Sequence, residues 1–298
     1  MSLSAKTSRP RIGAHTSIAG SLVNAAREAA GLGCNTFQIF TRSPRMWRSA
    51  PIDANQVAEF KDVRAQLGLG PLVIHGNYLT NMAASNSVVR GLSIEAFRDE
   101  VERGLAVGAD YLVIHPGSSK GHTLPKAMTT LASSIARATR GMRWNGLRLL
   151  LENTAGGGQT MGRDFEELAE LRALIERQAS IPVGYCLDTA HCYEAGFDIA
   201  APAGLDETLA AIDKTLGLDN VPVIHTNDSR TALGSRCDRH EHIGAGHIGR
   251  EGFRRILHHP RLAGKAFILE TPADENGTHA RNVKAIKSLL RRRPTGRR

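Results

Sequence analysis

Eight short apolar runs, most of them followed by a helical pattern, predict an α/β fold in the form of a single (β/α)8 TIM barrel. Strands that alternate with helices form parallel βαβ units, and eight such units can close into one barrel. No stretch of the 298 residues resembles a linker, and a hydrophobic content of 41% is sufficient for one large core. An open, doubly wound sheet gives a similar pattern and is the alternative fold.

The predicted strands are apolar on both faces, as expected for a buried parallel sheet. In chain order they are Arg11–His15, Thr36–Phe40, Leu72–His75, Tyr111–His115, Leu147–Glu152, Val183–Asp188, Val221–His225 and Ala266–Glu270. Between strands, apolar residues recur at helical spacing, as Ile94, Phe97 and Val101 do before Gly108. A glycine at that position is typical of the residue that ends a helix.

The positive charge of the chain is concentrated at its two ends. Residues 281–298 carry eight Lys or Arg and no acid, residues 1–27 carry four and no acid, and removing these twelve charges from the formal +9 leaves −3. We expect residues 1–280 to form the catalytic barrel and residues 281–298 a basic helix end and tail. The tail is interpreted either as a solvated segment or as a flexible arm that attracts phosphates.

The cysteines and the apolar segments bear on the compartment. Cys34, Cys186, Cys192 and Cys237 form no C-x-x-C pair, which favours reduced thiols and a cytoplasmic location, associated with the nucleoid in a prokaryote. No apolar run approaches the roughly 18 residues of a membrane span, and the N-terminal MSLSAKTSRPR has no signal-peptide core. We therefore expect no contact with a membrane, and we expect a monomer.

Residues that can bind metals end six successive predicted strands, the third to the eighth. They are His75, His115, Glu152, Asp188, His225 and Glu270, and three of them complete a repeated Val-Ile-His run. Three further candidates, His191, Asp238 and His240, lie shortly downstream of such strand ends. Because the carboxyl ends of the strands share one rim in a barrel, we expect these nine side chains to meet there.

Five imidazoles and four carboxylates form a ligand set that suits zinc, with iron or manganese as substitutes. Nine ligands are too many for one ion, whereas three ions would each have about three protein ligands and keep positions open for water or substrate. Three divalent ions outweigh the charge of four carboxylates, so the pocket would be net positive. Such a pocket suits a phosphate ester, whose hydrolysis bound metals promote.

Eight stretches of the sequence resemble the endonuclease IV family of apurinic/apyrimidinic (AP) endonucleases, in the xylose-isomerase-like TIM barrel superfamily. They are GAHTSIAGS, HGNYLTNMA, HPGSS, LENTAGGG, CLDTAHCYEAGFD, HTNDSR, GSRCDRHEHIGAGHIG and LETP. The resemblance implies a metal-dependent deoxyribonuclease IV of the phage-T4-induced type, with three zinc ions. Its substrate would be double-stranded DNA with abasic sites, cut on the 5′ side to leave a 3′-hydroxyl, or with blocked 3′ ends, which it would trim.

The family pattern also implies how the ligands are divided. The first zinc receives His75, His115 and Glu152, the second receives Glu152, Asp188, His225 and Glu270, and the third receives His191, Asp238 and His240. The implied catalytic residues are Glu270, which orients the attacking hydroxide, and Glu152, which bridges two ions; the carboxylate that takes the proton stays open. The chain departs from the family at Ala245, where an acid is expected, and at Gly157, where a glutamine is frequent.

Two loops are candidates for contact with DNA. TRSPRMW follows the second predicted strand and offers Arg45 and Trp47, and HGNYLTN follows the third and offers Tyr78. The resemblance implies that Arg45 and Tyr78 enter the duplex, although both aromatic residues would also suit simple packing against the barrel. His15, at the end of the first predicted strand, is expected to form a hydrogen-bonded wall of the pocket.

Two other functions fit parts of the pattern. The first is a sugar isomerase or epimerase of the xylose-isomerase-like class, which uses one or two divalent metals and leaves His191, Asp238 and His240 without a role. The second is a DNA-binding relative that does not cleave, which would leave all nine ligands idle. Nicking of an oligonucleotide with one abasic site separates the three interpretations.

Overall fold

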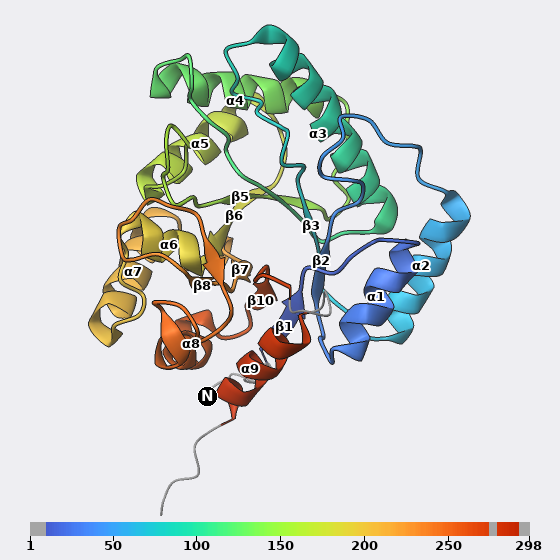
Figure 1. Cartoon of the computed structure of the whole chain (residues 1–298). Helices are drawn as coiled ribbons and strands as arrows, with labels where there is room; N and C mark the ends of the chain where they lie inside the picture. Colours follow the sequence, from blue (N-terminus) through green and yellow to red (C-terminus); the bar gives the residue numbers. More distant parts are fainter. Residues whose placement is uncertain (1–9, 274–278, 292–298) are drawn as a thin grey trace, which may run out of the picture.

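The computed structural model describes residues 10–273 and 279–291, and it confirms the predicted barrel. Eight parallel strands surround a common axis (Figure 1). They are β1 (Arg11–Ala14), β2 (Phe37–Ile39), β3 (Leu72–His75), β4 (Tyr111–Ile114), β5 (Arg148–Glu152), β6 (Val183–Asp188), β7 (Val223–His225) and β10 (Ala266–Leu269). The hydrogen-bonded order is β1-β10-β7-β6-β5-β4-β3-β2, and a parallel bridge between His15 and Gln38 brings the two ends of this sheet together.

The α-helices lie around the outside of the strands (Figure 1). They are α1 (Leu22–Gly31), α2 (Ala54–Gln66), α3 (Ser87–Val107), α4 (Leu124–Ala138), α5 (Phe165–Gln178), α6 (Thr189–Ala195), α7 (Pro202–Thr215), α8 (Gly249–His258) and α9 (Ala280–Leu290). Two short 3-10 helices, η1 (Leu218–Asn220) and η2 (Pro260–Leu262), and an antiparallel pair, β8 (Asp228–Ser229) and β9 (His240–Glu241), complete the elements. Gly108 ends α3 with φ 68°, as predicted.

Two apolar clusters support the fold. The larger one lies between the strands and the helices and contains Phe37, Phe97 and Phe253 among many others. The smaller one fills the inside of the barrel and contains Val73, Val113, Leu150, Cys186, Val223, Ala266 and Ile268. The strands are therefore covered on both faces, which is why they read as continuous apolar runs.

The C-terminal helix α9 is part of the outer layer of the barrel. Its Val283, Ile286 and Leu289 are buried, and Lys287 Nζ donates a hydrogen bond of 3.1 Å to Leu32 O. The basic tail beyond it, residues 292–298, and the basic start, residues 1–9, lie outside the described residues. Among the residues that are described, no helix is long and apolar enough to cross a membrane.

Candidate metal centre

A ring of eight polar side chains lies where the carboxyl ends of the strands meet, one for each strand. In six strands it comes two positions after a residue of the inner apolar cluster, as His75 does after Val73 and Glu270 after Ile268. Because side chains alternate along a strand, both residues of such a pair face the barrel axis. The ring consists of His15, Gln38, His75, His115, Glu152, Asp188, His225 and Glu270.

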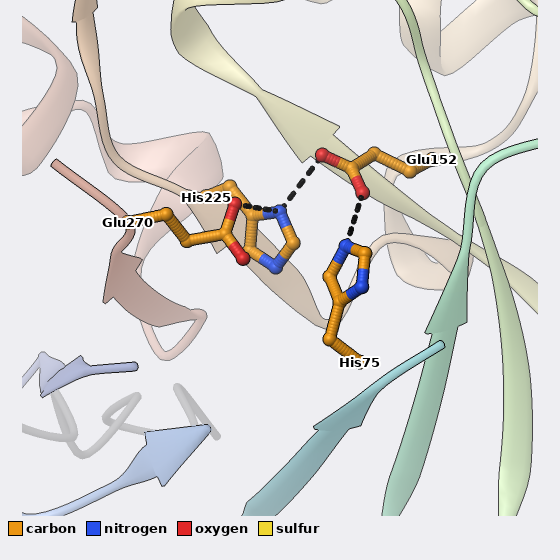
Figure 2. A group of neighbouring side chains, drawn as sticks. All are labelled: His75, Glu152, His225 and Glu270. Atoms are coloured by element: carbon orange, nitrogen blue, oxygen red, sulfur yellow. Dashed lines mark hydrogen bonds and ion pairs between the residues drawn. The ribbon is translucent and has the colours of Figure 1, made fainter. Parts of the chain in front are cut away.

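Glu152 lies at the centre of the first group of candidate ligands and is fully buried. Its Oε2 atom lies 3.3 Å from Nε2 of His75 and 3.3 Å from Nε2 of His115. Its Oε1 atom lies 2.8 Å from Nδ1 of His225, and Oε2 of Glu270 lies 3.1 Å from the same nitrogen (Figure 2). The two oxygens of one carboxylate thus face different histidines, as expected of a ligand shared by two ions.

A second group adjoins the first. The ligand atoms of Asp188, His191 and His240 lie within 4.8 Å of one another. Asp238, in an exposed loop, places Oδ2 3.3 Å from His191 Nε2 and Oδ1 3.7 Å from His240 Nε2. His191 Nδ1 also lies 3.6 Å from Glu152 Oε1. All nine candidate ligands therefore meet at the rim. Asp188 lies beside His191 and His240, two of the ligands expected for the third ion.

The electrostatics of the centre favour charged carboxylates. Burial alone would raise the pKa of Glu152, but the surrounding His225, His115 and His75 outweigh it and hold that pKa well below its usual range. Burial would lower the pKa of His191, yet the neighbouring Asp188 and Asp238 raise it well above its usual value. Glu152 and His191 thus each depend on opposite charges nearby, and a bound cation would take over the role of the protonated histidines.

The orientation of the histidine rings fits metal binding. Nδ1 of His75 donates to Gly76 O at 2.8 Å, and Nδ1 of His191 donates to Asn153 O at 2.9 Å. In the neutral form of both rings, Nε2 is then the unprotonated atom that faces the carboxylates, which is the tautomer a metal ligand needs. The buried Nε2 atoms of His191 and His240 face Asp238 at 3.3 Å and 3.7 Å but form no hydrogen bond in the described part of the chain. Divalent ions would satisfy them, so these residues fit such ions.

Gln38 is a site residue that the sequence did not reveal. It is fully buried in β2, its Nε2 donates a short hydrogen bond to Glu270 Oε1, and its Oε1 accepts one of 2.9 Å from His225 Nε2. His15 Nδ1 lies 3.0 Å from Gln38 Nε2, and His15 lines the pocket as expected. The only signal in the sequence was a glutamine inside the apolar run Phe37–Phe40.

Two asparagines form hydrogen bonds with the candidate ligands Asp188 and Glu270. Asn227 Nδ2 donates to Asp188 Oδ2 at 2.6 Å, and its Oδ1 accepts from the main-chain N–H of Glu270 at 2.8 Å. Asn153 Oδ1 accepts from the main-chain N–H of Asp188 at 2.7 Å. Such partners fix the direction in which a ligand points.

The two predicted DNA loops flank the pocket. Arg45 is exposed between β2 and α2. Tyr78 is 65% exposed, yet its ring centroid lies 5.2 Å from that of Phe40 and 5.9 Å from that of His75. Tyr78 thus forms one edge of a cavity of about 380 Å³ that six of the nine candidate ligands also line. Trp47 is partly buried, and its carbonyl oxygen accepts a hydrogen bond from Arg42.

The two departures from the family pattern have local consequences. A Cβ atom at Gly157 would lie 2.8 Å from Arg236 O, so a larger residue there would displace the loop that carries Asp238. Ala245 is exposed, and its loop is held by the buried Asp228, whose carboxylate accepts main-chain N–H groups between Gly244 and Gly249. Neither position belongs to the candidate ligands.

The chain is similar to known proteins. The model of the xylose isomerase-like TIM barrel family matches residues 26–292. A probable endonuclease 4 of Solibacter usitatus (strain Ellin6076) is 50% identical over 279 residues, which are 94% of this chain and 96% of that protein. The chain belongs to the endonuclease IV family. The crystal structure of endonuclease IV from Thermus thermophilus agrees with this membership, with a TM-score of 0.83 and 40% identity over 94% of this chain and 99% of that one.

Other barrels resemble the endonuclease IV family in fold alone. A D-tagatose 3-epimerase-like protein covers 94% of this chain with a TM-score of 0.66, but only 18% of the residues are identical. The barrel itself is therefore shared with proteins of different chemistry, and function has to be argued from the site.

Proposed function

We propose that this protein is an AP endonuclease that hydrolyses the DNA phosphodiester on the 5′ side of an abasic site and leaves a 3′-hydroxyl. Trimming of blocked 3′ ends belongs to the same proposal, because it is also the hydrolysis of a phosphate ester at a 3′ carbon. One observation carries the proposal: five histidines and four carboxylates converge at the rim of the barrel, in two adjoining groups with Glu152 between them. The names and identities of the relatives support it.

The nine residues would hold three zinc ions, with manganese or iron as substitutes. His75, His115 and Glu152 would hold one ion, and Glu152, Asp188, His225 and Glu270 another. Asp188 Oδ2 also lies 3.6 Å from His240 Nε2, beside the ligands of the third ion. His191, Asp238 and His240 would hold the third. When bound, zinc withdraws negative charge from a phosphate and lowers the pKa of water.

The chain supplies orientation and charge. Glu270 is held by Gln38 through its side chain and by Asn227 through its main chain, so its carboxylate has a fixed direction toward the pocket. The histidines around Glu152 and Glu270 hold the pKa of both carboxyl groups below its usual range, so both stay charged. Glu270 lines the cavity, whereas Glu152 is buried between the two groups of ligands, so Glu270 is the better candidate to orient the nucleophile at the phosphate.

The rim offers a way to reach the sugar of an abasic site. Enzymes that act on a nucleotide inside a duplex extrude it, at least cost where base pairing is already lost. Arg45 and Tyr78 stand exposed on two neighbouring loops beside the pocket and would fill the gap in the base stack. This assigns damage recognition to the loops and hydrolysis to the ring beneath them.

The proposal is tested by incubating the protein with a duplex that contains one abasic site and with the same duplex without it. We expect a single nick at the 5′ side of the lesion, with a 3′ end that a DNA polymerase extends directly. A second duplex with a blocked 3′ end should become extendable in the same way. Intact abasic duplex together with turnover of a ketose would instead favour the sugar epimerase interpretation.

A further inference from the structure

A buried charge pair lies beneath the two loops and outside the metal centre. Arg42 follows β2 and is 4% exposed, and Glu100 lies in α3 and is 2% exposed. Nη2 of Arg42 donates to Oε1 of Glu100 at 3.0 Å, and Nε donates to the same oxygen at 3.3 Å. A buried pair of this kind is seldom more stabilising than two apolar residues of the same size, so its hydrogen bonds are the feature to explain.

Each member of the pair also holds the main chain of one loop. Oε1 of Glu100 accepts a further hydrogen bond of 2.9 Å from the main-chain N–H of Asn77, in the loop that follows β3. Nη1 of Arg42 donates to the carbonyl oxygen of Trp47 at 2.9 Å, in the loop that follows β2. One carboxylate oxygen and one guanidinium therefore anchor both loops to α3.

Asn77 joins the two loops directly. Its Nδ2 donates to the carbonyl oxygen of Met46 at 2.8 Å, and its Oδ1 accepts from the main-chain N–H of Leu79 at 2.7 Å. Arg45 is thus next to an anchored residue, Met46, and Tyr78 lies between two anchored residues. The main-chain segments that carry Arg45 and Tyr78 therefore cannot move independently while these bonds are intact.

We propose that Arg42, Glu100 and Asn77 form a positioning cluster that fixes the two loops as one DNA-contacting surface. This inference rests on the proposed function, because it gives the cluster its purpose. Two side chains that fill a gap in a base stack must arrive at a fixed spacing, and order established before binding does not have to be created in the complex. The side chains of the cluster are buried, and their hydrogen bonds go to one another and to the loops rather than to the candidate metal ligands, so its members are positioning residues rather than catalytic ones.

Two variants test the cluster. Asn77→Ala removes the bond to Met46 and keeps the charge pair. The double variant Arg42→Met/Glu100→Leu removes both charges together, so that no unpaired charge stays buried. The matched control is Arg98→Met/Glu102→Leu, which removes an exposed ion pair of 3.0 Å on the same helix.

We expect both cluster variants to keep the metal content of the parent and to unfold at a slightly lower temperature, because main-chain groups of the loops lose their partners. Amide hydrogen exchange should rise in residues 43–50 and in residues 77–81 together, although Asn77→Ala changes only one loop. Affinity for abasic duplex should fall by about 10- to 100-fold, the cost of misplacing groups that position a substrate, with the loss in KM rather than kcat. The control should match the parent in all four measurements.

The outcomes separate the two proposals. If the parent binds and nicks abasic duplex while both cluster variants bind it equally well, the positioning role is wrong and the proposed function stands. If exchange rises in only one loop of Asn77→Ala, the loops are not joined and the inference is wrong as well. A parent that does not bind abasic duplex overturns the proposed function, and this inference with it.

Discussion

Two layers inside the barrel are built from the same strands and differ in almost every property. The lower layer, made of residues such as Val113 and Leu150, is apolar and fully buried. The layer above it, two residues farther along in six of the strands, is the polar ring that includes His115 and Glu152. Two residues along a strand separate these layers. Burial of the apolar layer stabilises the fold, whereas burial of the polar layer costs free energy.

The difference explains why the polar ring can exist. Buried carboxylates and imidazoles are tolerated only when they are paired with one another or with a metal. The apolar layer and the surrounding helices supply the stability, so the ring is free to have a composition set by chemistry. Changes in the lower layer should therefore alter stability, and changes in the ring should alter activity.

The largest contrast is expected within β10 and the residue that follows it. Glu270→Gln keeps the shape of the side chain and removes a charge, so it should lower the rate of nicking by at least about 100-fold, since loss of even an indirect partner of a metal costs 10- to 100-fold. Ile268→Val, two residues earlier, should cost about 0.5–1.5 kcal/mol of unfolding free energy and little activity. Equal nicking rates for Glu270→Gln and the parent would show that the role of Glu270 is wrongly assigned.

A smaller contrast is expected within β2. Gln38→Ala should lower activity by about 10- to 100-fold because Glu270 and His225 lose a common partner. Phe37→Leu, whose side chain faces the helices, should cost about 1 kcal/mol of stability and leave nicking unchanged. Steady-state nicking rates and thermal unfolding are measured for both variants. Loss of activity in Phe37→Leu, with full activity in Gln38→Ala, would contradict the prediction.

Changes in the loops above the ring should alter DNA binding and leave the metal centre beneath them unchanged. Arg45→Ala and Tyr78→Ala should keep the parent's metal content and lose about 1–3 kcal/mol of binding free energy for abasic duplex, as stacking and wedge contacts do. A fluorescent base opposite the lesion should report less unstacking in both variants. Unchanged affinity with unchanged fluorescence would mean that the loops serve structure and that damage is sensed elsewhere.

The smallest expected effect is on stability, whose pH dependence should have opposite directions in metal-free and metal-loaded protein. In protein stripped by a chelator, the raised pKa of His191 gives stability that is present below about pH 6.5 and is lost as the pH rises through that raised pKa, at about 1.4 kcal/mol per pKa unit. In metal-loaded protein the histidines must be neutral, so stability should increase as the pH rises from about 5 to about 7. Calorimetry of both forms checks this, and parallel curves would contradict it.

The sequence was sufficient for the barrel and for nine candidate ligands because both are local patterns. A strand that ends in His75 or Glu270 can be read without knowing its neighbours, and the barrel then brings such ends together. Gln38 was missed because glutamine is not a usual metal ligand and because its partners are far away in the chain. Arg42 and Glu100 were missed for a related reason: a charged residue in a helix pattern reads as solvated, and only packing shows that both are buried.

The polar ring and the residues downstream of it are proposed to form a centre for three metal ions. Elemental analysis of protein purified without chelator tests it most directly, together with the same analysis of His191→Ala and His240→Ala. We predict about three divalent ions per chain, mainly zinc, in the parent, and about two in each variant. One ion or none in the parent, or a count that neither variant changes, would contradict the account.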